Sequence, residues 1–308
     1  MFLPTFKRCA ALFLAVILLL ALCSACTEQQ STDKPQTTQT TQTTRPTTPT
    51  PEASYAAALA ALAEKNYTEA HALLSALGDY KDAPALLEKF VFRPTEIRSI
   101  GELIREHCTV FTYDEQGNCV KITEDDSTQL VFTYEKIGCP TQKQVLFAGE
   151  QSYVTNYVYD EAARLVEEIK KTEYNEYTVC YEYDENGRLK KRIMTCDDDI
   201  YSEPEVLEFF YDEHGNCIET YGHYAVGDHV NEYTYDENGR CIRQINPYGD
   251  ESTFQYDACG NRIKEIYVPY EEERGECVVT YTYEPFYFEG GIPGDWKNFI
   301  DRFVYDMY

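Results

Sequence analysis

Between residues 109 and 290, aromatic and polar positions alternate in the same way eight times. In each copy two aromatic residues stand two positions apart, and the residue between them is mostly Thr, Glu or Gln. Because successive side chains of a β-strand point to opposite faces, both rings share one face of the predicted strand. The eight pairs are Phe111 and Tyr113, Phe132 and Tyr134, Tyr157 and Tyr159, Tyr181 and Tyr183, Phe209 and Tyr211, Tyr233 and Tyr235, Phe254 and Tyr256, and Tyr281 and Tyr283.

A polar turn follows each aromatic pair, so each copy predicts a β-hairpin. Residues Tyr233 to Ile242, which read YTYDENGRCI, show the complete unit. The aspartate can accept hydrogen bonds from the amides that follow it, and the glycine three residues later can adopt the positive φ of a three-residue loop with a bulge. The five intact copies contain Asp114 and Gly117, Asp184 and Gly187, Asp212 and Gly215, Asp236 and Gly239, and Asp257 and Gly260.

These residues resemble the YD repeat of the RHS family, whose units read Tyr-x-Tyr-Asp-x-x-Gly and form β-hairpins joined into a winding sheet. Three copies depart from that pattern, at Glu135, at Asp160 with Ala163, and at Glu284, which has no glycine after it. One hairpin alone buries too little surface to offset the entropy cost of ordering its backbone. We therefore expect a mainly β fold, an antiparallel curved sheet of about eight stacked hairpins, with an unpaired first strand at 96–100.

The aromatic face of this sheet allows two interpretations. Tyrosine rings on a curved sheet can stack on sugar rings, whereas regular alternation is typical of a sheet whose apolar face forms the core. In the second case a ligand would contact the inter-repeat loops, such as 196–204 and 224–228, because loops can vary without disturbing the stack. The candidates for stacking on a ligand are Tyr181, Tyr183, Tyr233 and Tyr235.

The N-terminal segment has the pattern of an export signal. Two basic residues precede an apolar run over 10–22, which is too short for an ordinary membrane span. Ser24-Ala25-Cys26 then resembles the lipobox of bacterial lipoproteins. The resemblance implies a signal peptide over 1–25, lipidation of Cys26, and anchoring through a lipid bilayer at the outer face of a bacterial membrane. An ordinary signal peptide without a lipid is the alternative.

Three further segments follow the signal. Residues 26–50 are rich in Thr, Gln and Pro and contain too few apolar side chains to fold, so we expect a disordered tether. In 51–92 the apolar residues have helical spacing, and the stretch resembles a short tetratricopeptide-like helical hairpin. We expect it to be a stalk or a cap on the sheet, with an independent peptide-binding module as the alternative. The YD-repeat domain extends over 93–308, and its segment 296–304 has the spacing of a short C-terminal capping helix.

Composition narrows the range of partners. The chain has 308 residues and a formal charge of −26, which argues against nucleic acid as a partner because phosphates require clustered Lys and Arg. The nine cysteines beyond Cys26 are either small core side chains or include one or two disulfides. The acidic runs at 124–126 and 197–199 are expected to be solvated turns, with calcium binding as the alternative.

The chemistry-bearing residues suggest binding more than catalysis. The sequence contains no nucleophile elbow, phosphate loop or zincin motif, no cysteine–histidine spacing for zinc, and no cofactor motif. We therefore expect a non-catalytic scaffold or binding domain for an extracellular glycan or protein. The alternatives are a carbohydrate-active hydrolase on the same sheet and a toxin-associated fragment similar to RHS proteins. The sequence does not indicate an oligomeric state.

Overall fold

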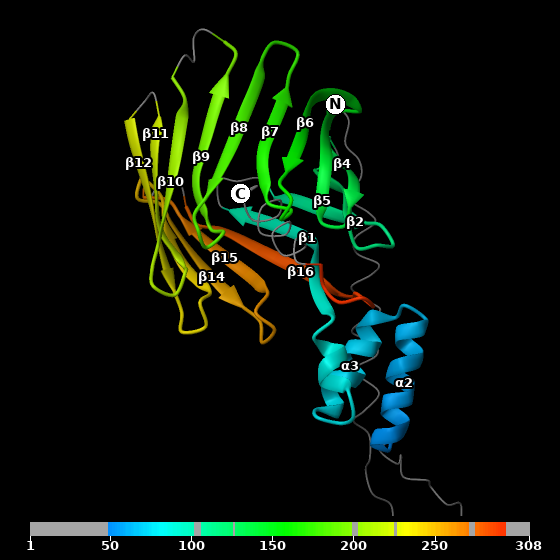
Figure 1. Cartoon of the computed structure of the whole chain (residues 1–308). Helices are drawn as coiled ribbons and strands as arrows, with labels where there is room; N and C mark the ends of the chain where they lie inside the picture. The colour runs from blue at the N-terminus through cyan, green and yellow to red at the C-terminus, as the bar shows by residue number, and fades with distance from the viewer. Residues whose placement is uncertain are drawn as a thin grey trace, which may run out of the picture. The chain divides into compact units, whose positions relative to one another are not determined.

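Sixteen antiparallel strands close into a barrel in the part of the chain that the structure describes (Figure 1). Each strand pairs with the next one along the chain, and β1 pairs with β16 to complete the ring. The computed structural model describes residues 49–101, 106–125, 127–198, 203–224, 227–270 and 275–293. The strands are β1 (Phe90–Gly101), β2 (His107–Tyr113), β3 (Cys119–Glu124), β4 (Thr128–Lys136), β5 (Cys139–Phe147), β6 (Glu150–Tyr159), β7 (Leu165–Lys171), β8 (Glu176–Tyr183), β9 (Leu189–Cys196), β10 (Glu205–Tyr211), β11 (Cys217–Tyr224), β12 (Gly227–Tyr235), β13 (Cys241–Ile245), β14 (Glu251–Tyr256), β15 (Arg262–Val268) and β16 (Cys277–Tyr287).

The closed barrel shows that the prediction of an open curved sheet of about eight hairpins was wrong. In every repeat the strand register shifts at the second aromatic residue, for example between Thr234 and Tyr235. Such a β-bulge adds one residue to one of the two strands, which bends the pair and increases its twist. Because the bulge recurs at the same position in all the repeats, the sheet bends steadily until its first strand meets its last.

The eighth hairpin is divided between the two ends of the barrel sequence. β16 supplies the strand that carries Tyr281 and Tyr283, and β1 supplies the return strand, with Pro94 opposite Tyr283. Because no turn connects these two strands along the chain, the copy at Glu284 needs no turn glycine. Residues 96–100, expected to form an unpaired strand, instead pair with β16, and 96–99 also pair with β2.

The second aromatic residue of every repeat links neighbouring hairpins. Its hydroxyl donates a hydrogen bond to a backbone carbonyl at the start of the return strand of the preceding hairpin. For example, the hydroxyl of Tyr235 donates to the carbonyl of Cys217 at 2.7 Å. The same bond joins the first hairpin, β2–β3, to the divided one, because Tyr113 on β2 donates to the carbonyl of Pro94 on β1 at 2.7 Å. Equivalent bonds are made by Tyr134, Tyr159, Tyr183, Tyr211, Tyr256 and Tyr283.

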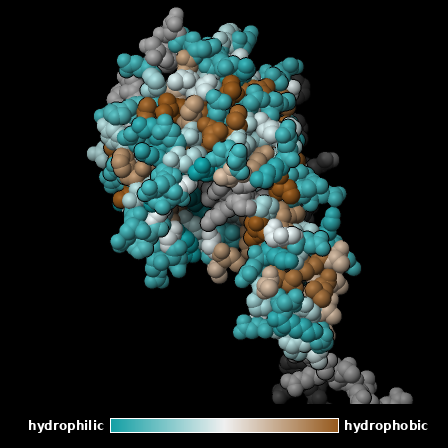
Figure 2. All heavy atoms as spheres, viewed as in Figure 1, coloured by the Kyte–Doolittle hydropathy of each residue, from teal (hydrophilic) through white to brown (hydrophobic). Residues whose placement is uncertain are grey.

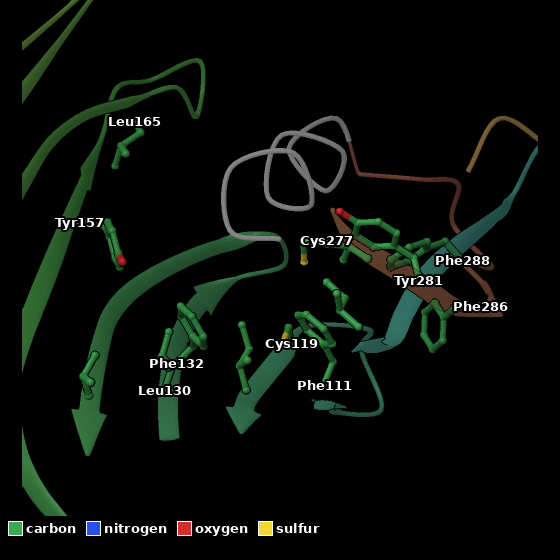
Figure 3. Packing of buried hydrophobic residues seen from close by; sticks show 14 residues of the cluster. Phe111, Cys119, Leu130, Phe132, Tyr157, Leu165, Cys277, Tyr281, Phe286 and Phe288 are labelled. Carbon is green, nitrogen blue, oxygen red and sulfur yellow. The ribbon is translucent and has the colours of Figure 1, made fainter. Parts of the chain in front are cut away.

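The paired aromatic rings form the inner wall of the barrel. None of the sixteen is exposed, whereas residues between them, such as Thr234 and Gln255, are exposed on the outer face. The most deeply buried rings pack with aliphatic side chains on β1–β7 and β16, and Figure 3 shows Phe111, Phe132 and Tyr157 among them. Burial of this aromatic face supplies the apolar contacts that a single hairpin lacks.

The face of the molecule shown in Figure 2 is mostly polar, although apolar side chains such as Phe210 and Ile242 are also exposed on the outer wall. Oppositely charged side chains pair across neighbouring strands on the outer wall, as in Lys191 with Glu208 at 2.9 Å and Arg243 with Glu251 at 2.5 Å. Partly exposed ion pairs of this kind contribute little to stability, but they place charges where water reaches them. The outer wall is therefore suited to contact with water.

In the described part of the chain, three helices precede β1: α2 (Pro51–Ala63), α3 (Tyr67–Leu77) and α4 (Ala83–Leu87). Thr50 caps α2 by accepting a hydrogen bond from the amide of Ala53, and Asn66 caps α3 by accepting one from the amide of Glu69. The ring of Tyr67 lies 5.2 Å from that of Phe286 on β16. The helical segment thus packs against the strand pair that closes the barrel.

Several predicted features lie outside the described residues. These are the signal peptide over 1–25, Cys26, nearly all of the tether, and the capping helix at 296–304. Within the described part of the chain, no helix is both long enough and apolar enough to cross a lipid bilayer.

Candidate ligand-binding site

The repeated aspartates and glycines shape the turns at one end of the barrel. Asp236 Oδ1 accepts hydrogen bonds from the amides of Asn238 and Arg240, each at 2.9 Å, while Gly239 has a φ of 73°. This φ is unfavourable for residues with a β-carbon, which is why glycine recurs here. The same arrangement occurs at Asp114 and Gly117, Asp184 and Gly187, Asp212 and Gly215, and Asp257 and Gly260.

A further turn residue was not predicted from the sequence, although its signal was present. The position after the turn glycine is Asn or Arg in every intact copy, and its side chain donates to the second oxygen of the turn aspartate. Arg240 Nε donates to Asp236 Oδ2 at 2.7 Å, and this hydrogen bond is the main cause of the lowered pKa of Asp236. The guanidinium also lies 5.2 Å from the ring of Tyr256 in the next repeat.

A cavity of about 420 Å³ lies on the inner face of β12–β15. Its walls combine aromatic rings with amide, hydroxyl and charged groups, and nearly all of these residues are half-buried, so solvent reaches them. A volume of this size falls within the range of small-molecule sites. The lining residues are Tyr233, Tyr235, Cys241, Gln244, Asn246, Asp250, Ser252, Phe254, Arg262, Glu265 and Tyr267.

The charged groups of the cavity are fixed by hydrogen bonds within the protein. Glu265 accepts hydrogen bonds from Ser252 Oγ at 2.8 Å and from the hydroxyl of Tyr281 at 3.0 Å. Asp250 Oδ2 accepts one from the hydroxyl of Tyr267 at 2.6 Å. These donors come from neighbouring strands, so the two carboxylates are held in defined positions along the wall.

One basic group faces the same cavity. The guanidinium of Arg262 lies 4.0 Å from the ring of Phe254, a distance typical of a cation–π contact. Arg262 begins the return strand of its hairpin, where three other copies place Cys119, Cys217 and Cys241. The exchange of a small residue for arginine puts a charge on the inner wall in this repeat.

The four tyrosines proposed to stack on a ligand lie in two different parts of the inner wall. Tyr233 and Tyr235 line the cavity, and Tyr235 uses its hydroxyl to hold the preceding hairpin. Tyr181 and Tyr183 do not line it. The hydroxyl of Tyr181 donates to Glu168 at 2.8 Å, and that of Tyr183 donates to the carbonyl of Leu165 at 2.7 Å.

The predicted binding loops and acidic runs are described only in part. Residues 199–202 and 225–226 of the two loops lie outside the described residues. In the acidic runs, Asp125 pairs with His107 at 2.5 Å, and Asp197 accepts a hydrogen bond from the amide of Glu176. The described residues contain no cluster of three or more His, Cys, Asp or Glu suited to a metal ion.

All nine cysteines in the described part of the chain are free thiols, so the disulfide alternative is not realised there. Cys119, Cys217 and Cys241 occupy equivalent positions at the start of return strands on the inner wall. Burial raises the pKa of the Cys119 thiol to about 12, which makes it unreactive at neutral pH. Each of the three donates weakly to a backbone carbonyl two residues further on.

Comparison with known proteins identifies one repeat directly. Residues 235–268, which include β13, β14 and β15, match the family model named RHS Repeat. The match confirms the predicted YD-repeat resemblance for this part of the chain, while the lipoprotein and tetratricopeptide-like resemblances stay predictions. No curated protein matches the sequence.

Solved structures give only distant likenesses. A porin-like protein from Bacteroides uniformis is 10% identical, with a TM-score of 0.45 over 62% of this chain and 96% of that one. A porin-like protein from Bacteroides vulgatus is 11% identical, with a TM-score of 0.34 over 62% of this chain and 98% of that one. The Tc holotoxin pore of Photorhabdus luminescens is 17% identical, with a TM-score of 0.29 over 56% of this chain and 9% of that one. Likenesses this weak give no information on function.

Proposed function

We propose that the protein is an exported, lipid-anchored binding protein that holds a small uncharged carbohydrate inside its barrel. The cavity beside Tyr233 is the observation that carries this proposal, because it combines aromatic faces with many hydrogen-bonding groups. Aromatic rings can cover the apolar faces of a sugar, while hydroxyl, amide and carboxylate groups recognise its hydroxyls. A protein partner is too large for a cavity of about 420 Å³.

The charges in the cavity favour an uncharged ligand. Asp250, Arg262 and Glu265 line the same wall, so positive and negative groups lie in one site. An anionic ligand would approach two carboxylates, and a cationic ligand would approach the guanidinium. A polyhydroxylated ligand can instead donate to the carboxylates and accept from the guanidinium without bringing a charge into the barrel.

Two observations support an exported protein that stands in water on a tether. The sequence begins with an export-signal pattern and a lipobox-like Cys26, followed by residues too polar to fold. The outer wall carries charged pairs such as Lys191 with Glu208, and charged groups on a lipid-facing wall would be costly. A lipid on Cys26 would therefore anchor the protein while the barrel remains outside the hydrocarbon.

A carbohydrate-active hydrolase is the competing function, because Asp250 and Glu265 line one cavity and two carboxylates are what glycoside hydrolysis requires. Both carboxylates, however, already accept hydrogen bonds from the protein. A general acid must instead carry a proton that it can donate to the leaving group. The arrangement is better suited to recognition than to proton transfer.

Calorimetric titration with mono- and disaccharides tests the proposal. We expect the full chain to bind at least one uncharged sugar, and Tyr233→Leu to weaken binding about tenfold, since an aromatic contact contributes about 1 kcal/mol. Tyr181→Leu is the matched control, because Tyr181 has the same place in its repeat but lies outside the cavity. Absence of binding, or equal losses in both variants, would contradict the proposal. Release of new reducing ends from an oligosaccharide would favour the hydrolase.

A further inference from the structure

Four strongly exposed aromatic side chains lie in, or directly beside, the described turns that connect one repeat to the next. Phe147 is 61% exposed, Tyr174 84%, Tyr248 68% and Tyr270 75%. In an antiparallel barrel, alternate turns lie at opposite ends, so the inter-repeat turns that the structure describes lie at the end away from the Asp-to-Gly turns (Figure 1). We call this set the aromatic rim. Exposed aromatic residues gathered at one end indicate an interaction surface, because isolated ones would be scattered.

Two of the rim tyrosines are positioned by a shared turn, 246–250. Asn246 Oδ1 accepts a hydrogen bond from the amide of Tyr248 at 2.9 Å. Asp250 Oδ1 accepts one from the amide of Tyr270 at 2.8 Å. Gly249 has a φ of 84°, and a β-carbon there would lie 3.0 Å from the ring of Tyr270, so glycine lets this ring rest against the turn. Both exposed rings are therefore carried by a backbone that is fixed by side chains.

Tyr174 borders an open groove of about 760 Å³ at the start of β6. Thr172 Oγ1 accepts hydrogen bonds from the amides of Tyr174 and Asn175, which fixes the turn that carries the ring. Apart from Val154, every side chain in this groove can form hydrogen bonds, and those of Tyr153 and Tyr174 add aromatic faces. The groove is lined by Gln151, Ser152, Tyr153, Val154, Asn156, Lys171, Thr172, Glu173 and Tyr174.

We propose that the aromatic rim binds an extended, uncharged polysaccharide from outside the barrel. Exposed tyrosines can stack on sugar rings at separate points along one polymer, and the hydroxyl and amide groups of the Tyr174 groove can bind sugar hydroxyls. The chain has a formal charge of −26, which repels anionic polysaccharides and anionic lipid surfaces. This surface lies outside the cavity inside the barrel, although Asn246 and Asp250, which position two of its tyrosines, also line that cavity.

Co-sedimentation with insoluble cellulose, chitin and α-glucan tests the rim. The protein is the full chain with Cys26→Ala, so that no N-terminal lipid contributes to sedimentation. We expect the protein to sediment with at least one polymer, and a variant with Tyr174→Ala, Tyr248→Ala and Tyr270→Ala to lose affinity at least about tenfold. Because these side chains are exposed, the thermal unfolding of the variant should remain close to that of the parent.

Two control variants distinguish the rim from the outer wall and from the inner cavity. Phe210→Ala removes an exposed aromatic residue from the outer wall, and Tyr233→Leu alters the inner cavity. Both variants should sediment as the parent does. A failure of the rim proposal can therefore be distinguished from a failure of the proposed sugar binding in the inner cavity. Lack of sedimentation with every polymer, or full sedimentation of the triple variant, would overturn the proposal. Rim-dependent flotation with phosphatidylcholine vesicles and no polymer binding would replace the polysaccharide with a lipid surface.

Discussion

Replacement of Arg93 by leucine should destabilise the barrel at its divided hairpin. Arg93 is the counterpart, on β1, of the arginine that follows the turn glycine in other repeats, and its side chain is 14% exposed. Its guanidinium donates to Glu284 Oε1 at 2.6–2.7 Å and lies 4.3 Å from the ring of Tyr113 and 4.4 Å from that of Phe286. Leucine retains apolar volume but removes all of these interactions.

The contacts of Arg93 give the size of the expected loss. Each cation–π contact at such a partly desolvated site contributes about 1 kcal/mol. Glu284 is 43% exposed, so solvent screening limits the ion pair to about 1 kcal/mol as well. The sum of about 3 kcal/mol should lower the melting temperature by about 6–12 °C for a domain of this size.

The repeats supply a matched control in Arg240→Leu. Arg240 contacts Asp236 and the ring of Tyr256 in the same way, but its hairpin is continuous and its side chain is 35% exposed. We expect a loss of about 1 kcal/mol from this change. Thermal and urea unfolding of the full chain, followed by circular dichroism, measures both variants. Equal shifts, or no shift in Arg93→Leu, would refute the view that the divided hairpin depends on this arginine.

Three further outcomes are expected. Gly239→Val should lower the melting temperature strongly because valine is strained at a φ of 73°, whereas Asn238→Lys should be nearly neutral; equal melting temperatures would contradict the turn geometry. The pKa of Asp236 is lowered in the folded state, so its contribution to stability is complete above the unfolded pKa of about 3.9 and is lost as the pH falls through the folded value. Urea unfolding at pH 3 and pH 6 should therefore show a smaller difference in Asp236→Asn than in the parent. Cys26→Ala should abolish metabolic labelling with fatty acids, and unchanged labelling would exclude lipidation at this residue.

Local features of the fold could be predicted because each is encoded within about ten residues. The alternation of Tyr233 and Tyr235 with exposed Thr234, and the turn from Asp236 to Gly239, are visible in one hairpin. The partner of the turn aspartate could have been found in the same way, since Asn or Arg follows the glycine in every intact copy.

Closure of the barrel could not be predicted by the same reasoning. It depends on the pairing of β1 with β16, whose residues are far apart in the sequence, and on the cumulative bend of many small bulges. When the copy at Glu284 is taken for an ordinary hairpin, the absence of a turn glycine resembles the degeneration of a repeat. The cavity could not be predicted from the sequence either, because its wall combines Tyr233, Ser252 and Arg262, which come from different strands and meet only in the folded barrel.

The divided hairpin also constrains how such a protein can evolve. An open array of repeats can gain or lose a unit by duplication or deletion, because each unit contacts only its neighbours. In a closed barrel, the strand number and stagger together set the circumference. One duplicated hairpin would add two strands to the ring, so Glu284 on β16 and Arg93 on β1 would have to meet again around a larger circumference. The number of repeats is therefore constrained by the whole barrel. A change in that number requires β1 and β16 to pair again in a ring of different circumference.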